Sequence, residues 1–180
     1  MPVEYEAKVL EVDPEAITDA VRALGGRLVG EARQRRFVYD IVPGDESRWI
    51  RLRDDGTRVT LAVKEIAHDG IDGTTETEIV VDDFDTAAAL LRRAGHSPKS
   101  YQENDRTSFV LDGVRLDLDR WPGIPPYLEI EGSSTREVVE TAARLGFTSE
   151  VLTSENTVKV YARYGIDLTT VAELRFPSDA

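Results

Sequence analysis

The sequence predicts an α+β fold built on a closed eight-stranded antiparallel β-barrel, with helices packed against its outside. Eight short segments alternate between apolar and polar residues, as strands do. Amphipathic helical segments lie between and after them, and can cover the apolar face of a sheet. Charged residues also recur in pairs on one face of strand after strand. Eight strands can close into a barrel whose interior holds a small ligand.

Four segments carry helix start and stop signals. Asp13 and Pro14 open the first helix, which ends at Gly25. Ser134 and Glu137 form a capping box at the start of the third. The expected helices cover residues 14–24, 83–94, 134–146 and 154–164, and the tail at 168–174 is compatible with a further short helix.

The strands are predicted from period-two alternation and from the turns between them. Asp55-Gly56 and Asp112-Gly113 are hairpin turn signals. No repeat, low-complexity segment or long linker interrupts the pattern, so we expect one domain over residues 1–180. The expected strands cover residues 3–10, 35–41, 49–53, 58–66, 74–81, 106–111, 114–119 and 127–131.

The charged residues of these strands fall on a shared face, because residues i and i+2 point to the same side. For any single strand, a half-exposed sheet with its charges in water is the better explanation. Recurrence on strand after strand favours a sheet closed with its charged face inward. The candidate interior carboxylates are Glu4, Glu6, Glu76, Glu78, Asp117, Asp119, Glu129 and Glu131, and the cations are Lys8, Arg51, Arg53, Lys64, Arg106 and Arg115.

Such a charged interior predicts a site for phosphate groups and metal ions. Burying these charges without ligands would carry a large desolvation cost. Carboxylates hold hard cations through oxygen, and arginine and lysine hold phosphate oxygens. Phosphoryl transfer needs little beyond positioning, a metal ion and positive charge.

Composition excludes several classes of protein. The net charge of −12 argues against a nucleic acid or an anionic membrane as partner, because both need a basic footprint. The absence of cysteine excludes disulfides, thiolate zinc sites and a cysteine nucleophile. No apolar run approaches a membrane span, and the N-terminus lacks the blocks of a signal peptide. We expect a cytoplasmic monomer or homodimer whose partner is a small molecule that carries phosphate groups.

An ordered set of motifs resembles a known family. Residues 4–8 read Glu-Tyr-Glu-Ala-Lys, an ExExK motif near the N-terminus. Further motifs follow at residues 49–53, 61–65, 76–78, 117–119 and 127–131, with Arg106 between them. Over residues 3–165 the chain resembles CYTH-domain proteins, also called triphosphate tunnel metalloenzymes, which include class IV adenylyl cyclases and thiamine triphosphatases.

The resemblance implies roles for the interior residues and a requirement for Mg²⁺ or Mn²⁺. The implied metal-binding residues are Glu4, Glu6, Glu76, Glu78, Asp119, Glu129 and Glu131. The expected substrate-binding residues are Lys8, Arg36, Arg51, Arg53, Lys64, Arg106 and Arg115. The expected catalytic residues are Glu4, Glu6, Lys8 and Lys64. Two positions depart from the family pattern: Asn104 replaces a common lysine, and Arg36 replaces a common acidic residue.

Three functions are compatible with this pattern. The first is metal-dependent hydrolysis of inorganic triphosphate or a nucleoside triphosphate. The second is an adenylyl cyclase that makes cyclic AMP and pyrophosphate from ATP. The third is a non-catalytic module that binds polyphosphate or nucleotide.

Overall fold

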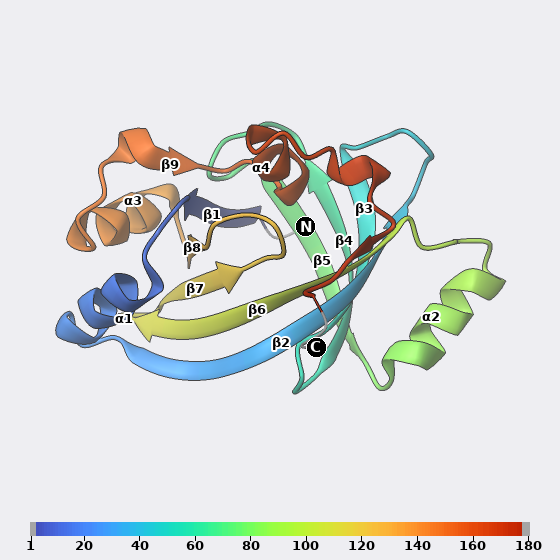
Figure 1. Ribbon diagram of the computed structural model, residues 1–180, viewed down its shortest axis with the longest axis horizontal. Helices are drawn as coiled ribbons and strands as arrows, with labels where there is room; N and C mark the ends of the chain where they lie inside the picture. The colour runs from blue at the N-terminus through green and yellow to red at the C-terminus, as the bar shows by residue number, and fades with distance from the viewer. Residues whose placement is uncertain (1–2, 178–180) are drawn as a thin grey trace.

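The strands of the computed structural model, which describes residues 3–177, close into an antiparallel barrel (Figure 1). Their order around the barrel is β6-β2-β3-β4-β5-β1-β8-β7, and β7 pairs back onto β6. The barrel strands are β1 Val3–Val9, β2 Arg27–Asp40, β3 Arg48–Asp54, β4 Val59–Ile66, β5 Thr74–Val81, β6 Ser100–Leu111, β7 Val114–Arg120 and β8 Tyr127–Gly132. The predicted eight-stranded barrel is therefore confirmed within the described range.

Four α-helices in residues 3–177 pack outside this barrel. They are α1 Pro14–Ala23, α2 Phe84–Arg93, α3 Thr135–Arg144 and α4 Thr157–Arg163. The helices α1 and α3 lie on the side of β1, β7 and β8, whereas α2 lies on the opposite side, near β3 (Figure 1). None of the helices in this range is long and apolar enough to cross a membrane.

The helices bury the apolar face of the strands, which leaves the charged face to the interior. Ala7, Leu116, Leu128 and Ile130 are fully buried on the outer face, in one core with Val21 and other residues of α1 and α3. Fully burying one such aliphatic side chain contributes about 1.5–3 kcal/mol. Because side chains alternate along each strand, the neighbouring charged residues must point into the barrel.

Two strands are longer than their sequence pattern predicts. The predictions that β2 starts at residue 35 and β6 at residue 106 are wrong, because these strands pair from Arg27 opposite Val110 to Val38 opposite Ser100. A register shift between Leu28 and Gly30 disturbs the alternation on β2. The added part of β6 is polar and has little strand propensity of its own, so cross-strand pairing determines its conformation.

The C-terminal segment also differs from the prediction. Helix α4 begins at Thr157 and not at residue 154, because the Asn156 side chain caps it by accepting a hydrogen bond from the Lys159 backbone N–H at 3.0 Å. Ser154 instead donates to the Glu6 carbonyl at 2.9 Å. The tail forms a 3₁₀ turn, Leu168–Thr170, and a short strand β10, Glu173–Leu174, parallel to β6. Another short strand, β9 Leu152–Thr153, pairs with β1.

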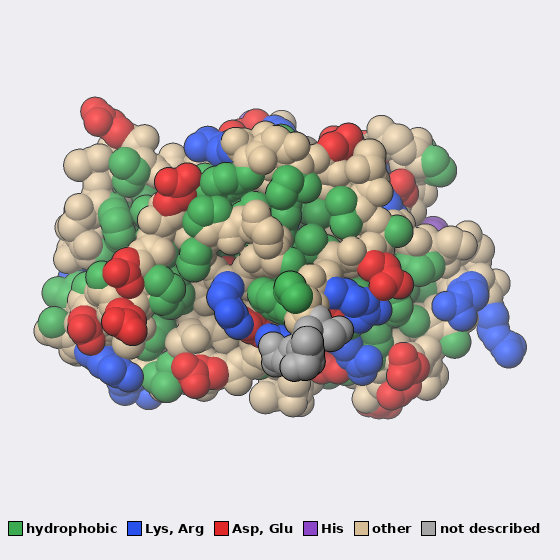
Figure 2. Space-filling view, in the orientation of Figure 1, with side chains coloured by type: hydrophobic (Ala, Val, Ile, Leu, Met, Phe, Trp, Pro, Cys, Tyr) green, Lys and Arg blue, Asp and Glu red, His purple; other side chains and the backbone are tan. Residues whose placement is uncertain are grey.

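The face of the molecule seen in Figure 2 shows no concentration of one charge. Acidic and basic side chains are scattered over the face shown in Figure 2, between apolar and uncharged atoms. The concentrated charge of this protein lies inside the barrel.

Candidate active site

A cavity of about 350 Å³ occupies the barrel interior. This volume lies in the range of small-molecule sites. Every site residue expected from the sequence lines the cavity except Asp119. The charged lining of the barrel wall comprises Glu4, Glu6, Lys8, Arg36, Arg51, Arg53, Lys64, Glu76, Glu78, Arg106, Arg115, Glu129 and Glu131.

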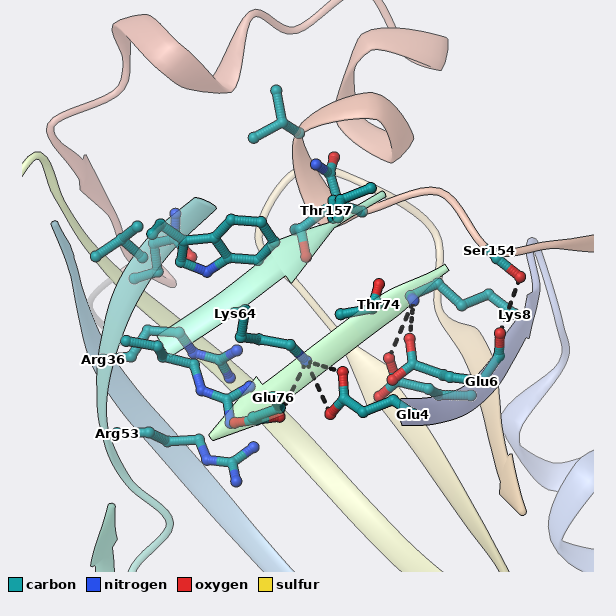
Figure 3. Close-up of a pocket in the computed structure, with 18 of the residues that line it drawn as sticks. Glu4, Glu6, Lys8, Arg36, Arg53, Lys64, Thr74, Glu76, Ser154 and Thr157 are labelled. Carbon is teal, nitrogen blue, oxygen red and sulfur yellow. Dashed lines mark hydrogen bonds and ion pairs between the residues drawn. The ribbon is translucent and has the colours of Figure 1, made fainter. Parts of the chain in front are cut away.

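Lysines hold the carboxylates on the side of the cavity formed by β1 (Figure 3). The Lys64 ammonium lies 2.8 Å from a Glu4 oxygen and 3.2 Å from a Glu76 oxygen. The Lys8 ammonium contacts Glu6 and lies 3.2 Å from Glu129. Burial opposes the charge of Lys8, but the charges of Glu6 and Glu129 outweigh it and raise the pKa of Lys8.

Burial, together with neighbouring carboxyl groups, raises the pKa of two of these carboxylates. Burial and a hydrogen bond with Glu76 raise the pKa of Glu4 to about 8. Burial opposes the ionisation of Glu76, but the hydrogen bond from Glu4 and the charge of Arg51 lower its pKa to about 2. Burial and the charge of Glu129 raise the pKa of Glu6. Near neutral pH, Glu4 therefore keeps a proton while Glu76 is ionised.

The chemistry of this donor set fits a hard divalent cation. Glu4, Glu6, Glu129 and Glu131 offer only carboxylate oxygens, which Mg²⁺ prefers. A cation would also offset the burial and the neighbouring negative charge that raise the pKa values of Glu4 and Glu6. As the side chains stand, no three acidic or histidine residues in the described chain are arranged to hold a metal ion. Metal binding would therefore require the ammonium groups of Lys8 and Lys64 to leave the carboxylates and to contact the bound substrate instead.

We expect the affinity for Mn²⁺ to rise with pH up to about 8. The cation binds the ionised carboxylate, whereas Glu4 is protonated below its raised pKa of about 8. Below that pH, each unit of pH decrease should weaken binding by about tenfold, since one proton must leave. Calorimetry from pH 6 to pH 9 measures this slope. A pH-independent affinity in the wild type, or the same slope in Glu4→Gln, would contradict the assignment.

The opposite wall carries arginines that acidic residues neutralise only in part. Arg36 is only 7% exposed and bonds to two neutral amides, Gln34 at 3.1 Å and Asn104. Its guanidinium also lies 4.6 Å from the centre of the Trp121 ring. Burial, with the charges of Arg53 and other nearby arginines, lowers the pKa of Arg36 to about 9. Within the described chain, no carboxylate forms an ion pair with Arg36.

Arg51 and Arg53 lie beside Arg36 and are incompletely bonded. Arg51 binds Glu76 at 2.6 Å and Glu78 at 3.0 Å, and Arg53 reaches Glu78 at 3.4 Å. Burial, with the charges of Arg51 and Arg106, lowers the pKa of Arg53 to about 10. The Nε atoms of all three arginines are buried without a hydrogen-bond partner among the described residues. An anion in the cavity would satisfy these donors and the surplus charge.

Arg106, in contrast, is fully neutralised by acidic residues. Its guanidinium lies 2.7 Å from Asp117 and also binds Asp119 and Glu129. Asp119 is fully buried behind Arg106, accepts two hydrogen bonds from its guanidinium, and accepts a third from the Asn104 amide at 2.9 Å. Arg115 also lines the cavity, with its side chain 41% exposed and its guanidinium 2.8 Å from Asp117.

Sequence reasoning gave no role to several residues that shape the site. Gln34 and Asn104 are buried polar residues that bind Arg36, and Trp49 and Trp121 line the cavity. Inward-facing alternation on β2 and β6 could have identified the first two, if the full length of those strands had been predicted. Trp49 shares the face of Arg51 and Arg53 at i, i+2 spacing, so the same rule could have identified it.

Comparison with known proteins gives one family and a consistent fold. The CYTH domain model matches residues 3–161. No curated protein matches the chain at a significant level. The PH1012 protein from Pyrococcus horikoshii is 23% identical, with a TM-score of 0.74 over 87% of this chain and 98% of that one.

Two further solved structures share the fold. A candidate adenylate cyclase from Vibrio parahaemolyticus is 15% identical, with a TM-score of 0.74 over 89% of this chain and 98% of its own. A Hippeastrum protein described as having a dominant triphosphatase activity is 19% identical, with a TM-score of 0.60 over 92% and 96% of the two chains. At these identities the likeness shows the fold alone. The family match spans most of the chain and, with the barrel and its charged interior, shows that this protein belongs to the CYTH family.

Proposed function

We propose that this protein is a divalent-metal-dependent enzyme that hydrolyses inorganic triphosphate or a nucleoside triphosphate. The observation that carries the proposal is the arginine cluster of Arg36, Arg51 and Arg53, whose buried Nε atoms lack hydrogen-bond partners in the described chain. Three guanidinium groups can bind several phosphate oxygens at once, as charge-assisted hydrogen bonds. A phosphate chain therefore complements this wall better than a single carboxylate would.

The family relationship supports the same assignment. Enzymes of the CYTH family that act on triphosphates generally depend on a divalent metal ion. The Hippeastrum protein with the same fold has a dominant triphosphatase activity. The carboxylates that would hold Mg²⁺ or Mn²⁺ here are Glu4 and Glu6, with Glu129 and Glu131 near them and Glu76 and Glu78 on the adjoining strand. The bound ion would neutralise phosphate charge and make the phosphorus more electrophilic.

The residues around the phosphates have separate roles in this proposal. Arg36, Arg51 and Arg53 bind and align the phosphate chain along one wall. Lys8 and Lys64 bring their ammonium groups to the phosphates once these groups leave the carboxylates. Glu4, whose pKa of about 8 keeps it protonated near neutral pH in the ligand-free protein, gives up that proton when it binds the metal ion beside Glu6.

Asp119 and Arg115 have supporting roles in the proposed site. Asp119 holds Arg106 in place through the ion pair between their side chains. Arg115, which lines the cavity and is 41% exposed, is suited to attract an anion from solution. Neither a nucleic acid nor a membrane is needed as partner, and the substrate is a small molecule of the cytoplasm.

The products of the reaction test this proposal directly. The purified protein is incubated with tripolyphosphate, ATP or thiamine triphosphate, each with Mg²⁺, Mn²⁺ or EDTA, and the products are separated. We expect metal-dependent release of phosphate or pyrophosphate from at least one substrate, and none with EDTA. Cyclic AMP from ATP would instead identify a cyclase. Tight binding without any product would identify a non-catalytic module.

A further inference from the structure

Uncharged groups hold Arg36 in the cavity wall, on the side opposite Lys8 (Figure 3). The Arg36 guanidinium donates to the Gln34 side-chain oxygen at 3.1 Å and to the Asn104 side-chain oxygen. The centre of the Trp121 ring lies 4.6 Å from the guanidinium carbon. The Arg36 Nε is buried and has no hydrogen-bond partner in the described chain. These contacts fix the position of the cation and leave its charge unmatched.

The two amides that bind Arg36 come from facing positions on neighbouring strands. Gln34 on β2 pairs directly with Asn104 on β6. Arg36 lies two residues after Gln34, so both side chains point to the same face of β2. Gln34 is 3% exposed and Asn104 is 0% exposed. Because buried amides need hydrogen-bond partners to offset their desolvation, both are committed to the contacts that they make here.

The Asn104 amide also connects Arg36 to the ion pair behind it. The amide nitrogen donates to an Asp119 oxygen at 2.9 Å, while the amide oxygen accepts from Arg36. Arg36 offers only donors and Asp119 offers acceptors, so one orientation of the amide satisfies both. Asp119 is fixed in turn by two hydrogen bonds from Arg106. Arg36 is therefore anchored on a buried ion pair through a neutral group, which brings no carboxylate into contact with it.

An acidic residue at either amide position would change the state of Arg36. The ammonium groups of Lys8 and Lys64 contact carboxylates, so their charge is matched before any ligand arrives. These lysines must exchange partners to bind phosphate. The substitutions Asn104→Asp and Gln34→Glu would place Arg36 in the same situation.

We infer that Gln34 and Asn104 are positioning residues that hold Arg36 for the substrate phosphates without neutralising it. This inference rests on the proposed triphosphate site and adds two residues to it. Both act through Arg36 and bond neither the phosphates nor the metal ion. Arg36 can therefore bind a phosphate group without first leaving an acidic partner.

The test introduces an acidic group at each amide position, with and without Arg36. Gln34→Glu and Asn104→Asp are made in the wild type and in Arg36→Met. Calorimetry with Mg²⁺ present measures the affinity of each protein for the imido analogue of tripolyphosphate. In the wild-type background we expect each substitution to weaken binding by about 30-fold, as for one lost charge-assisted bond. In Arg36→Met the same substitutions should change the affinity by less than about twofold, because the cation that they neutralise is absent.

A neutral substitution separates the added charge from the lost hydrogen bonds. Asn104→Leu removes both bonds of the amide at similar volume and adds no charge. We expect it to weaken binding by about fivefold, as for one neutral hydrogen bond. Its stability in urea should also fall, because Asp119 loses a donor. A merely structural role predicts the loss of stability with unchanged affinity.

The possible outcomes separate this inference from the proposed function. Wild-type affinity in both acidic variants, or equal weakening with and without Arg36, would overturn the roles of Gln34 and Asn104 and leave the triphosphate site standing. Wild-type protein that does not bind the analogue would overturn both. If Asn104→Asp does not fold, Gln34→Glu decides the question, because the Gln34 side chain bonds to Arg36 and not to Asp119 in the described chain.

Discussion

Replacing Glu4 and Glu6 together with glutamine should abolish metal-dependent turnover. Glutamine keeps the size of each side chain and removes the charge that a cation needs. A catalytic metal ion contributes several kcal/mol to transition-state stabilisation, so we expect a decrease in kcat of about 100-fold or more. Mn²⁺ binding, measured by calorimetry, should be lost in the same protein.

An outward-facing glutamate supplies the matched control for this double variant. Glu65 follows Lys64 on β4, so its side chain points to the other face of the sheet. Glu65→Gln also removes a strand carboxylate, and it should leave both kcat and Mn²⁺ affinity unchanged. Undiminished Mn²⁺ binding in the Glu4→Gln/Glu6→Gln protein would show that these residues are not metal ligands.

Replacing Arg36 should weaken triphosphate binding and stabilise the ligand-free protein. Arg36 is a buried cation without an acidic partner in the described chain, among other cations. Replacing even a buried ion pair by apolar side chains of similar volume is often neutral or stabilising by about 1–4 kcal/mol, and a buried cation without an acidic partner lacks the attraction that offsets its desolvation. In Arg36→Met, the free energy of unfolding should rise by about 1 kcal/mol or more. Affinity for triphosphate should fall by about 30-fold, as expected for one lost charge-assisted bond of about 2 kcal/mol.

Arg106→Met provides the comparison, because Arg106 is a buried cation with several acidic partners whereas Arg36 has none in the described chain. It leaves Asp117 and Asp119 buried without their main cationic partner. We expect this protein to lose about 3–5 kcal/mol of stability. Urea unfolding and competition binding measure both quantities. If Arg36→Met destabilised the free protein and bound triphosphate normally, Arg36 would be a structural residue and not a ligand-binding one.

Phosphate-chain length provides a second measurement on these proteins. Arg36, Arg51 and Arg53 come from two adjacent strands and form an extended wall. Wild-type affinity should fall stepwise from triphosphate to pyrophosphate to phosphate, because shorter chains reach fewer guanidinium groups. The Arg53→Ala protein should show a smaller difference between triphosphate and pyrophosphate, because one contact along the wall is missing.

The charged face of most strands could be predicted from the sequence, because alternation fixes which side each residue faces. Glu4, Glu6 and Lys8 are an example: whatever their partners, they must share one side of β1. The closed barrel followed from the recurrence of such faces together with apolar faces that the helices could cover. This part of the fold depends on local patterns alone.

Contacts between strands could not be predicted in the same way. Arg36 and Asn104 were recognised as separate departures from the family pattern, yet the structure brings their side chains into contact. On β6 an uncharged amide stands where a lysine is common, and the cation comes from β2 instead. That relation depends on the register of β2 against β6, which places Gln34 opposite Asn104 and which the irregular start of β2 concealed.

The pairing of carboxylates with cations also depends on which strands the fold brings together. The sequence shows that acidic and basic residues share the inward faces, but not which of them neutralise each other. Lys8, Lys64, Arg51 and Arg106 are each held by at least two acidic residues, whereas Arg36 is held by none in the described chain. This difference identifies Arg36 as the cation that most needs an anion beside it.

The most direct measurement is anomalous diffraction from crystals soaked with Mn²⁺ and the imido analogue of tripolyphosphate. The account predicts a manganese peak at the carboxylates of Glu4 and Glu6. It also predicts phosphate groups bonded to Arg36, Arg51 and Arg53 inside the barrel. A barrel interior that remains empty while the ligand or the metal binds only on the outer surface would contradict it.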